Sequence, residues 1–158
     1  MSDYSVGLEP WSDGLWAEMK PHAEAHFAEV DGGLEPYRQF NLDLRLMHAI
    51  ADAGSLKVVI ARKAGELVGY FTWNLMLDVE CEGLLIAQQG GWYVAPGHPS
   101  VAAKMFDASV AAFKAMGVKC LFPHHRTNGR GSNIGRFFQR RGARHIQHTY
   151  SLWIGGPV

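Results

Sequence analysis

Residues 91–113 read GWYVAPGHPSVAAKMFDASVAAF, and the character of the sequence changes halfway through this stretch. Aromatic and β-branched residues at 92–94 are typical of a buried strand, and Pro96-Gly97-His98-Pro99 ends it. The Ala-rich segment that follows has the apolar spacing of an amphipathic helix, which we expect over about 99–116. The break is either an ordinary strand-to-helix turn or a place where backbone N–H groups bind a phosphate.

The segments on either side predict the rest of the fold. Residues 56–77 contain two β-rich runs joined by a turn at 63–66, as in an antiparallel hairpin, and residues 83–94 form a third strand with a bulge at Gly90-Gly91. A short apolar strand at 118–122, a helix at 133–141 and a last strand at 144–154 follow. Helices are expected at 11–20, capped by Ser12, at 21–30, where Pro21 ends or restarts the first, and at 41–54, capped by Asn41.

This order predicts one α/β (α+β) domain over residues 1–158, with a mixed, mostly antiparallel sheet and helices on both faces. The only parallel connection is a βαβ unit, which should be right-handed. The N-terminus lacks a signal-peptide pattern and no apolar run is long enough to span a membrane, so we expect a cytoplasmic protein. Cys81 and Cys120 lie in apolar segments and are expected to be buried free thiols.

A net charge of zero conceals a strong asymmetry along the chain. All 15 acidic residues lie at or before Asp107, whereas the eight basic residues that follow it have no acidic neighbour in sequence. The C-terminal third therefore either binds a polyanion or neutralises the rest of the fold. The acidic first two thirds suit a cationic amine ligand.

Four stretches together resemble the GNAT acetyltransferases: GELVGYFTWNLM (65–76), GWYVAP (91–96), AMGVKCLF (115–122) and NIGRFFQRRGARHIQHTYSLWI (133–154). The likeness is closest to the small GNAT-like proteins of bacteriophages, which share an N-terminal pattern like Pro21…His26…Glu29. It covers about residues 56–154. It implies a GNAT fold with a splayed central strand pair, and transfer of an acetyl group from acetyl-CoA (coenzyme A) to a primary amine by direct attack in a ternary complex.

The resemblance also implies a cofactor site with a physical basis. A splayed strand exposes backbone groups to the amide-rich pantetheine arm, and a helix N-terminus directs N–H groups at the pyrophosphate. It assigns pantetheine contacts to Trp92, Tyr93 and Val94. Donors around the pyrophosphate and further contacts would come from His98, Ser100, Val101, Ala102, Ala103, Lys104, Asn133, Phe137 and Phe138.

Two positions depart from the family pattern. The phosphate loop usually has an Arg and two glycines, but residues 98–103 read HPSVAA. A Tyr that protonates the departing thiolate is replaced by Phe138, so Tyr93 or Tyr150 is the candidate acid. Each of these two tyrosines could equally be an aromatic that fills the sheet.

The amine must lose a proton before it attacks, and Glu80 and Glu82, expected beside the splayed strands, are the candidate proton acceptors. They could equally be exposed acids at a strand end. No metal site is expected, because His145 and His148 would point to opposite faces of a strand.

A second function is carried by RTNGRGSNIGRFFQRRGAR (126–144), in which six arginines alternate with glycines and two phenylalanines. These arginines either bind nucleic acid or bind the phosphates of coenzyme A while the phenylalanines pack in the core. The alternative to an enzyme is therefore a catalytically degenerate GNAT-fold protein that binds nucleic acid or a protein partner. The acceptor, a small molecule or a macromolecular amine, is not identified, and a homodimer is possible for this family.

Overall fold

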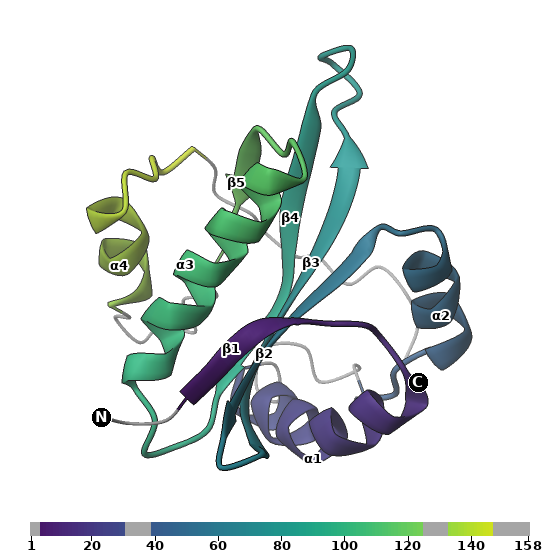
Figure 1. Ribbon diagram of the computed structural model, residues 1–158, viewed down its shortest axis with the longest axis vertical. Helices are drawn as coiled ribbons and strands as arrows, with labels where there is room; N and C mark the ends of the chain where they lie inside the picture. The colour runs from purple at the N-terminus through teal and green to yellow at the C-terminus, as the bar shows by residue number, and fades with distance from the viewer. Residues whose placement is uncertain (1–3, 31–38, 125–132, 147–158) are drawn as a thin grey trace.

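The computed structural model describes residues 4–30, 39–124 and 133–146, and Figure 1 shows its five strands in one twisted sheet. The strands lie in the order of the sequence: β1 (Tyr4–Glu9), β2 (Leu56–Lys63), β3 (Glu66–Leu77), β4 (Leu85–Val94) and β5 (Cys120–Phe122). Neighbours are antiparallel except β4 and β5, which run parallel. The α+β fold class and the mostly antiparallel sheet are confirmed.

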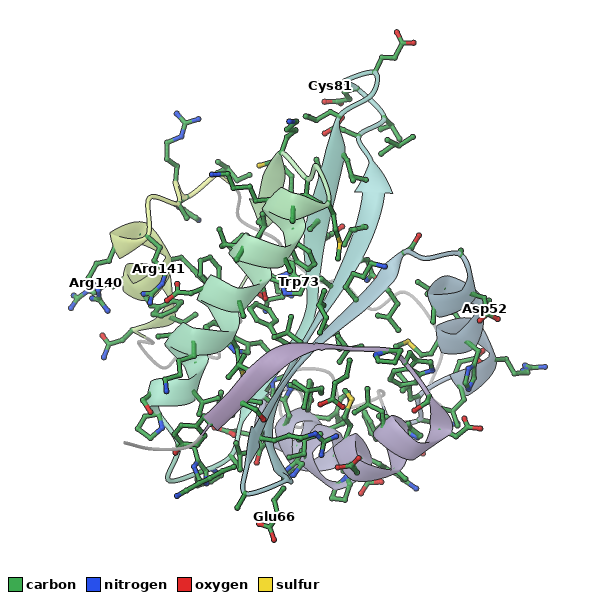
Figure 2. The ribbon with its side chains drawn as sticks, viewed as in Figure 1. Asp52, Glu66, Trp73, Cys81, Arg140 and Arg141 are labelled. Carbon is green, nitrogen blue, oxygen red and sulfur yellow. The ribbon has the colours of Figure 1, made fainter. Side chains whose placement is uncertain are left out.

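Four helices cover the two faces of this sheet: α1 (Asp13–Val30), α2 (Leu44–Asp52), α3 (Ser100–Ala115) and α4 (Ile134–Arg140). One apolar cluster joins α3 and α4 to the sheet around Phe71, Trp73 and Phe113. The other joins α1 to the opposite face around Leu15, Met19 and Tyr70. Figure 2 shows Trp73 between α3 and the sheet, where its Nε1 donates to the buried Ser109 Oγ at 3.2 Å. Period-two alternation in β2 and β3 therefore builds a core on each face.

Arg62 of β2 holds the edge strand and α1 in place. Its guanidinium donates to both carboxylate oxygens of Glu9 in β1, at 2.8 and 2.9 Å, and to those of Glu18 in α1, at 2.5 and 3.1 Å. Hydrogen bonds from Arg62 lower the pKa of the Glu18 carboxyl, as expected for a paired acid. The three side chains are partly exposed, so these ion pairs add little to the free energy of folding and mainly orient β1 and α1 relative to β2.

Two sequence predictions about the N-terminal part were incomplete or wrong. Strand β1 was not predicted, because a six-residue strand with Ser5 and Gly7 in it has little β signal. Residues 13–30 form one helix that continues through Pro21, because Leu15, Met19 and Ala23 bury one continuous face against the sheet. The predicted cap of α1 is confirmed, because Ser12 Oγ accepts a hydrogen bond from Leu15 N–H at 3.1 Å.

The remaining corrections concern a helix cap and the cysteines. Helix α2 is capped by Asp43, whose Oδ1 accepts from Leu46 N–H at 3.1 Å, and begins three residues after the predicted cap Asn41. Cys81 and Cys120 are free as expected but exposed, because one lies in a hairpin turn and the other begins a short strand that has only one partner among the described strands. The predicted last strand falls mostly on residues 147–154, outside the described residues. No helix in the described part is long and apolar enough to cross a bilayer.

Candidate functional site

Strand β4 contains a β-bulge where it pairs with β3. Phe71 pairs with Trp92, but two residues further along β3 Trp73 pairs with Gln89, so Gly90 and Gly91 together oppose Thr72. The Thr72 hydroxyl accepts from Gly91 N–H at 2.7 Å. A Cβ at Gly90 would lie 2.4 Å from Thr72 Oγ1, which explains why this position has no side chain. The bulge that the two glycines predict is confirmed.

Beyond the bulge, β4 and β5 separate. Their parallel pairing ends at Gln88 with Phe122, so β4 has no β5 partner from Gln89 to Val94. The Gln89 side chain fills the start of the gap, because its Oε1 accepts from His124 N–H at 3.0 Å. Alternate backbone groups on this edge of β4 therefore face a space that no described strand occupies. Such groups are the donors and acceptors that an extended amide-containing ligand needs.

The gap leads to the N-terminus of α3. No side chain caps this helix, and its first turn has no acid. Val101 N–H already donates to His98 O at 3.0 Å, whereas Ser100 and Ala102 have no intrahelical acceptor for their N–H groups. Gly97 makes the turn at φ 87°, a conformation that favours glycine. An uncapped helix N-terminus of this kind favours a negatively charged group.

Two predicted phosphate donors contact β1 at the same end of α3. His98 Nδ1 lies 2.8 Å from the Tyr4 hydroxyl, so this ring fastens the loop to the edge strand. The Lys104 ammonium lies 5.1 Å from the centre of the Tyr4 ring, within cation–π distance. Both side chains thus position the loop through a residue of the strand that sequence reasoning missed.

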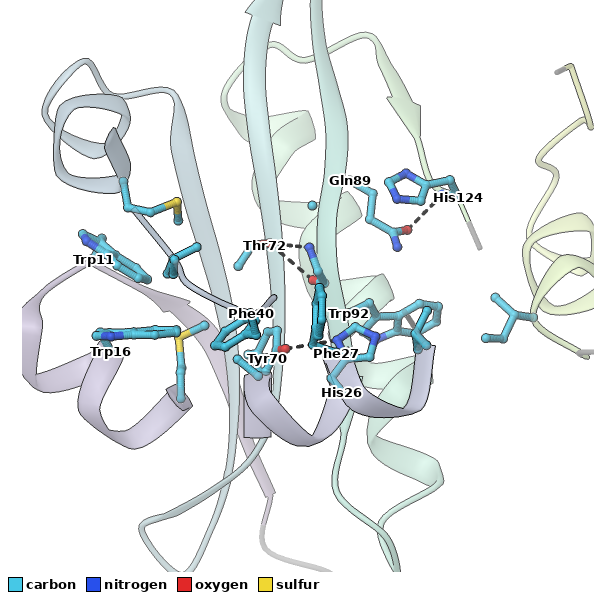
Figure 3. A pocket seen from close by; sticks show the side chains of 18 residues that line it. Trp11, Trp16, His26, Phe27, Phe40, Tyr70, Thr72, Gln89, Trp92 and His124 are labelled. Carbon is cyan, nitrogen blue, oxygen red and sulfur yellow. Dashed lines mark hydrogen bonds between the residues drawn. The ribbon is translucent and has the colours of Figure 1, made fainter. Parts of the chain in front are cut away.

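A cavity of about 310 Å³ lies between α1, α2 and the bulge (Figure 3). Its floor is formed by β3 and β4, and it extends to Gln89 and His124 at the gap between β4 and β5. The described residues that line it are Trp11, Trp16, Met19, Ala23, His26, Phe27, Val30, Phe40, Leu42, Met47, Tyr70, Thr72, Gln89, Gly90, Gly91, Trp92, His124 and Ile134. One continuous space therefore connects the unpaired edge of β4 with the helices on the opposite face of the sheet.

The cavity contains a pair of groups suited to proton transfer. His26 Nδ1 lies 3.1 Å from the Tyr70 hydroxyl. Burial, and next the neighbouring Tyr93, raise the pKa of Tyr70 well above its usual value, so this phenol stays neutral. A neutral phenol can accept from Nδ1–H or donate to Nδ1, so this hydrogen bond can fix the orientation of the imidazole ring. Tyr93 stacks on Tyr70 with ring centres 5.8 Å apart and contacts the rings of His22 and His26.

Several predicted cofactor residues turn out to pack within the protein. Val101 and Phe138 are buried in the core between α3, α4 and the sheet, and the Phe138 ring centre lies 5.5 Å from that of Trp92 in a tilted arrangement. The Phe137 ring contacts the Arg141 guanidinium at 4.0 Å. Asn133 precedes α4 but makes no side-chain cap bond. Trp92, Tyr93 and Val94 belong to the part of β4 that has no β5 partner, and Ala103 lies in the first turn of α3.

The predicted proton acceptors are not beside the splayed strands. Glu80 and Glu82 are exposed at the tip of the β3–β4 hairpin, which extends beyond the rest of the molecule near the labelled Cys81 in Figure 2. From Leu85 to Gly90 the strand spans roughly 17 Å at about 3.3 Å per residue. The prediction of their location was wrong, because hairpin length cannot be read from a turn. Tyr150 lies outside the described residues, and within the described ranges no three potential ligands converge on a metal site.

The polar groups of the cavity were mostly missed by sequence reasoning. His26 was noted only as part of a pattern, and Thr72 and Gln89 were not singled out. A signal for this part of the site was present, because adjacent glycines in one strand indicate a bulge or a close approach of the facing residue, here Thr72. His26 could not be placed without knowing that α1 runs unbroken past Pro21.

No protein-family model matches the chain, and none of the curated proteins does. Solved structures that share its fold over almost their full length include the following three. An aminoglycoside acetyltransferase from an uncultured soil metagenomic sample has a TM-score of 0.72 and 17% identity, covering 96% of this chain and 99% of its own. A ribosomal-protein-alanine N-acetyltransferase from Brucella melitensis biovar Abortus has a TM-score of 0.68 and 17% identity, with the same coverage of 96% and 99%.

The third structure is an aminoglycoside N-acetyltransferase in complex with CoA, with a TM-score of 0.61 and 12% identity, covering 98% of this chain and 96% of its own. At these identities the likeness concerns the fold. The bulge in β4, the parting of β4 from β5 and the uncapped start of α3 are the features that the sequence resemblance led us to expect. The chain therefore has the fold of the GNAT acetyltransferases.

Proposed function

We propose that the protein is an N-acetyltransferase that moves an acetyl group from acetyl-CoA to a primary amine. The observation that carries this proposal is the continuity of one path: the uncapped N-terminus of α3, the unpaired edge of β4 from Gln89 to Val94, and the cavity beyond the bulge. The first part suits a pyrophosphate and the second an amide-rich arm. The third would hold an amine at the end of that arm.

The residues present fit acetyl-CoA by several physical criteria. Ser100 and Ala102 offer backbone N–H groups at the positive end of a 16-residue helix. Trp92 lines the cavity, and its buried Nε1 has no hydrogen-bond partner among the described residues. A buried donor of this kind is normally satisfied, so a ligand acceptor would remove its cost. The missing Arg and glycines of the loop predict a weaker phosphate site than is usual in the family.

Acetyl-CoA would supply an activated carbonyl carbon, to which the amine nitrogen bonds as the carbon–sulfur bond breaks and the thiolate leaves. The chain must accept one proton from the amine. We assign this step to His26, because it lines the cavity and the neutral Tyr70 beside it can fix its ring. Imidazole is a common general base in enzymes. Glu80 and Glu82 lie at the exposed hairpin tip and do not line the cavity. Tyr93 remains the proposed acid for the thiolate.

A coupled pair of assays tests this function. Thiol release from acetyl-CoA, followed with a thiol reagent, should require both the protein and a primary amine. Acetyl-CoA binding is measured separately by calorimetry, so that a poorly chosen amine does not decide the result. The absence of cofactor binding at millimolar concentration would reject the enzyme and leave the alternative, a degenerate GNAT-fold protein that binds nucleic acid or a protein partner.

A further inference from the structure

The cavity is chemically divided along its length. Its inner end, at the bulge, has the polar groups of His26, Tyr70, Thr72 and Gln89. Its outer end, between α1 and the segment before α2, is a row of aromatic rings. Figure 3 shows Trp11 and Trp16 at one end of the cavity, and Gln89 and His124 at the other.

The aromatic row is continuous. Trp11 and Trp16 have ring centres 5.9 Å apart, Trp16 and Phe40 are separated by 6.3 Å, and Phe40 and Phe27 by 5.4 Å. Leu42 and Met47 complete this end of the cavity. Rings at these separations form an apolar surface that packs best against another flat or apolar group.

Charge is missing from the described lining. None of the described residues around the cavity is Asp, Glu, Lys or Arg. Three charged residues of α1 pair elsewhere: Glu18 with Arg62, Lys20 with Glu24, and Asp13 with His48. A polyamine or an aminoglycoside would bring several ammonium groups into this space. Each would lose water without gaining a carboxylate from the described lining, which makes burial of a multiply charged ligand there unfavourable.

A single amine is a different case. Burial without a carboxylate lowers the pKa of a bound ammonium ion and therefore favours the neutral, nucleophilic amine. Any remaining positive charge can lie over an indole face. The volume of about 310 Å³ is at the small end of ligand sites, which usually span roughly 300–1,000 Å³. It suits one ring system with a short arm.

We infer that the acceptor is a monoamine carried on an aromatic or apolar body, with the nitrogen at the His26–Tyr70 end and the body against Trp16 and Phe40. This inference rests on the proposed function for the reaction, but the binding preference is independent of turnover. It differs from the expectation that the acidic part of the sequence suits a cationic amine. Two of those acids, Glu9 and Glu18, pair with Arg62 instead.

Calorimetry of amine binding in the presence of CoA tests the inference without turnover. We expect 2-phenylethylamine to bind at least tenfold more tightly than spermidine or kanamycin. Trp16→Ala should weaken 2-phenylethylamine binding about tenfold, Trp16→Phe less than threefold, and Leu46→Ala, on an exposed face of α2, less than twofold. The wild-type comparison needs no variant to fold.

Equal or tighter binding of the polycations, or no binding of 2-phenylethylamine, would overturn the inference. Either result is separable from failure of the proposed function. Acetyl transfer to spermidine with kcat/KM as high as that to 2-phenylethylamine would preserve the acetyltransferase and remove this acceptor class. No binding of acetyl-CoA would remove the acetyltransferase, while the amine preference could still be measured on the protein alone.

Discussion

The contact between Gly90 and Thr72 allows a quantitative test of the bulge that opens the site. In Gly90→Ala the new Cβ would lie 2.4 Å from Thr72 Oγ1, whereas ordinary contacts begin at 3.4 Å, so either the two strands must part or the Thr72 hydroxyl must turn away. Overpacking of this kind costs about 1–3 kcal/mol. Displacing the hydroxyl also breaks its 2.7 Å bond with Gly91 N–H, at about 1 kcal/mol. We expect a total loss of about 2–4 kcal/mol in the free energy of unfolding.

Removing the hydroxyl should relieve most of this cost. Thr72→Ala alone should lose about 1–2 kcal/mol, mainly from the unpaired Gly91 N–H. In the Thr72→Ala background the remaining neighbours of a Gly90 Cβ lie at 3.4 Å, so the second change should cost less than about 1 kcal/mol. The double variant should therefore be about 1–4 kcal/mol more stable than the sum of the two single changes predicts. Urea unfolding followed by tryptophan fluorescence measures all four proteins, and additivity within about 0.5 kcal/mol would refute the described bulge.

Three further predictions concern the helix start, the buried phenol and the proton acceptor. Ser100→Glu should weaken acetyl-CoA binding at least tenfold without lowering the melting temperature, because a carboxylate at the N-terminus of α3 repels phosphate but suits the helix dipole. The control Ala111→Glu, exposed further along α3, should leave the affinity within twofold. Equal affinities of the two variants would argue against a phosphate at this end of the helix. Because the pKa of Tyr70 is raised in the folded protein, the unfolded chain ionises first, and the free energy of unfolding should fall as pH rises above about 10, by up to about 1.4 kcal/mol per pH unit. Urea unfolding at alkaline pH should show that Tyr70→Phe lacks this part of the slope. Parallel stability curves for the wild type and the variant would contradict the burial of a neutral phenol. In steady-state assays His26→Gln should lower the turnover of acetyl transfer about 10²-fold or more, with acetyl-CoA affinity unchanged within twofold. Glu82→Gln at the hairpin tip should leave turnover within twofold. The reverse pattern would assign the proton acceptor to the hairpin.

The sheet and its bulge were predictable because their signals are local. Alternation in residues 56–77 and the adjacent glycines at 90–91 directly indicate a hairpin and an irregular strand, and the structure confirms both. The turn after Val94 and the start of α3 within one residue of Pro99 were equally readable from Pro and Gly. These features locate the cofactor side of the site.

The acceptor side was not predictable, because it depends on packing between distant segments. The continuation of α1 past Pro21 is decided by burial against the sheet, and it places His26 beside Tyr70, 44 positions away. Tyr4 of β1 forms a hydrogen bond with His98, and no local sequence pattern indicates this contact. Glu80 and Glu82 were predicted beside the splayed strands, but they lie at the hairpin tip. The turn residues do not encode how far the hairpin extends beyond the sheet.

The central claim is that the gap between β4 and β5 and the start of α3 bind acetyl-CoA. Calorimetric titration of the wild-type protein with acetyl-CoA, repeated with Ser100→Glu, tests it most directly. The account predicts micromolar binding with one site per chain, and an affinity at least tenfold weaker in the variant. No heat of binding at millimolar acetyl-CoA, or identical affinities of the two proteins, would contradict it.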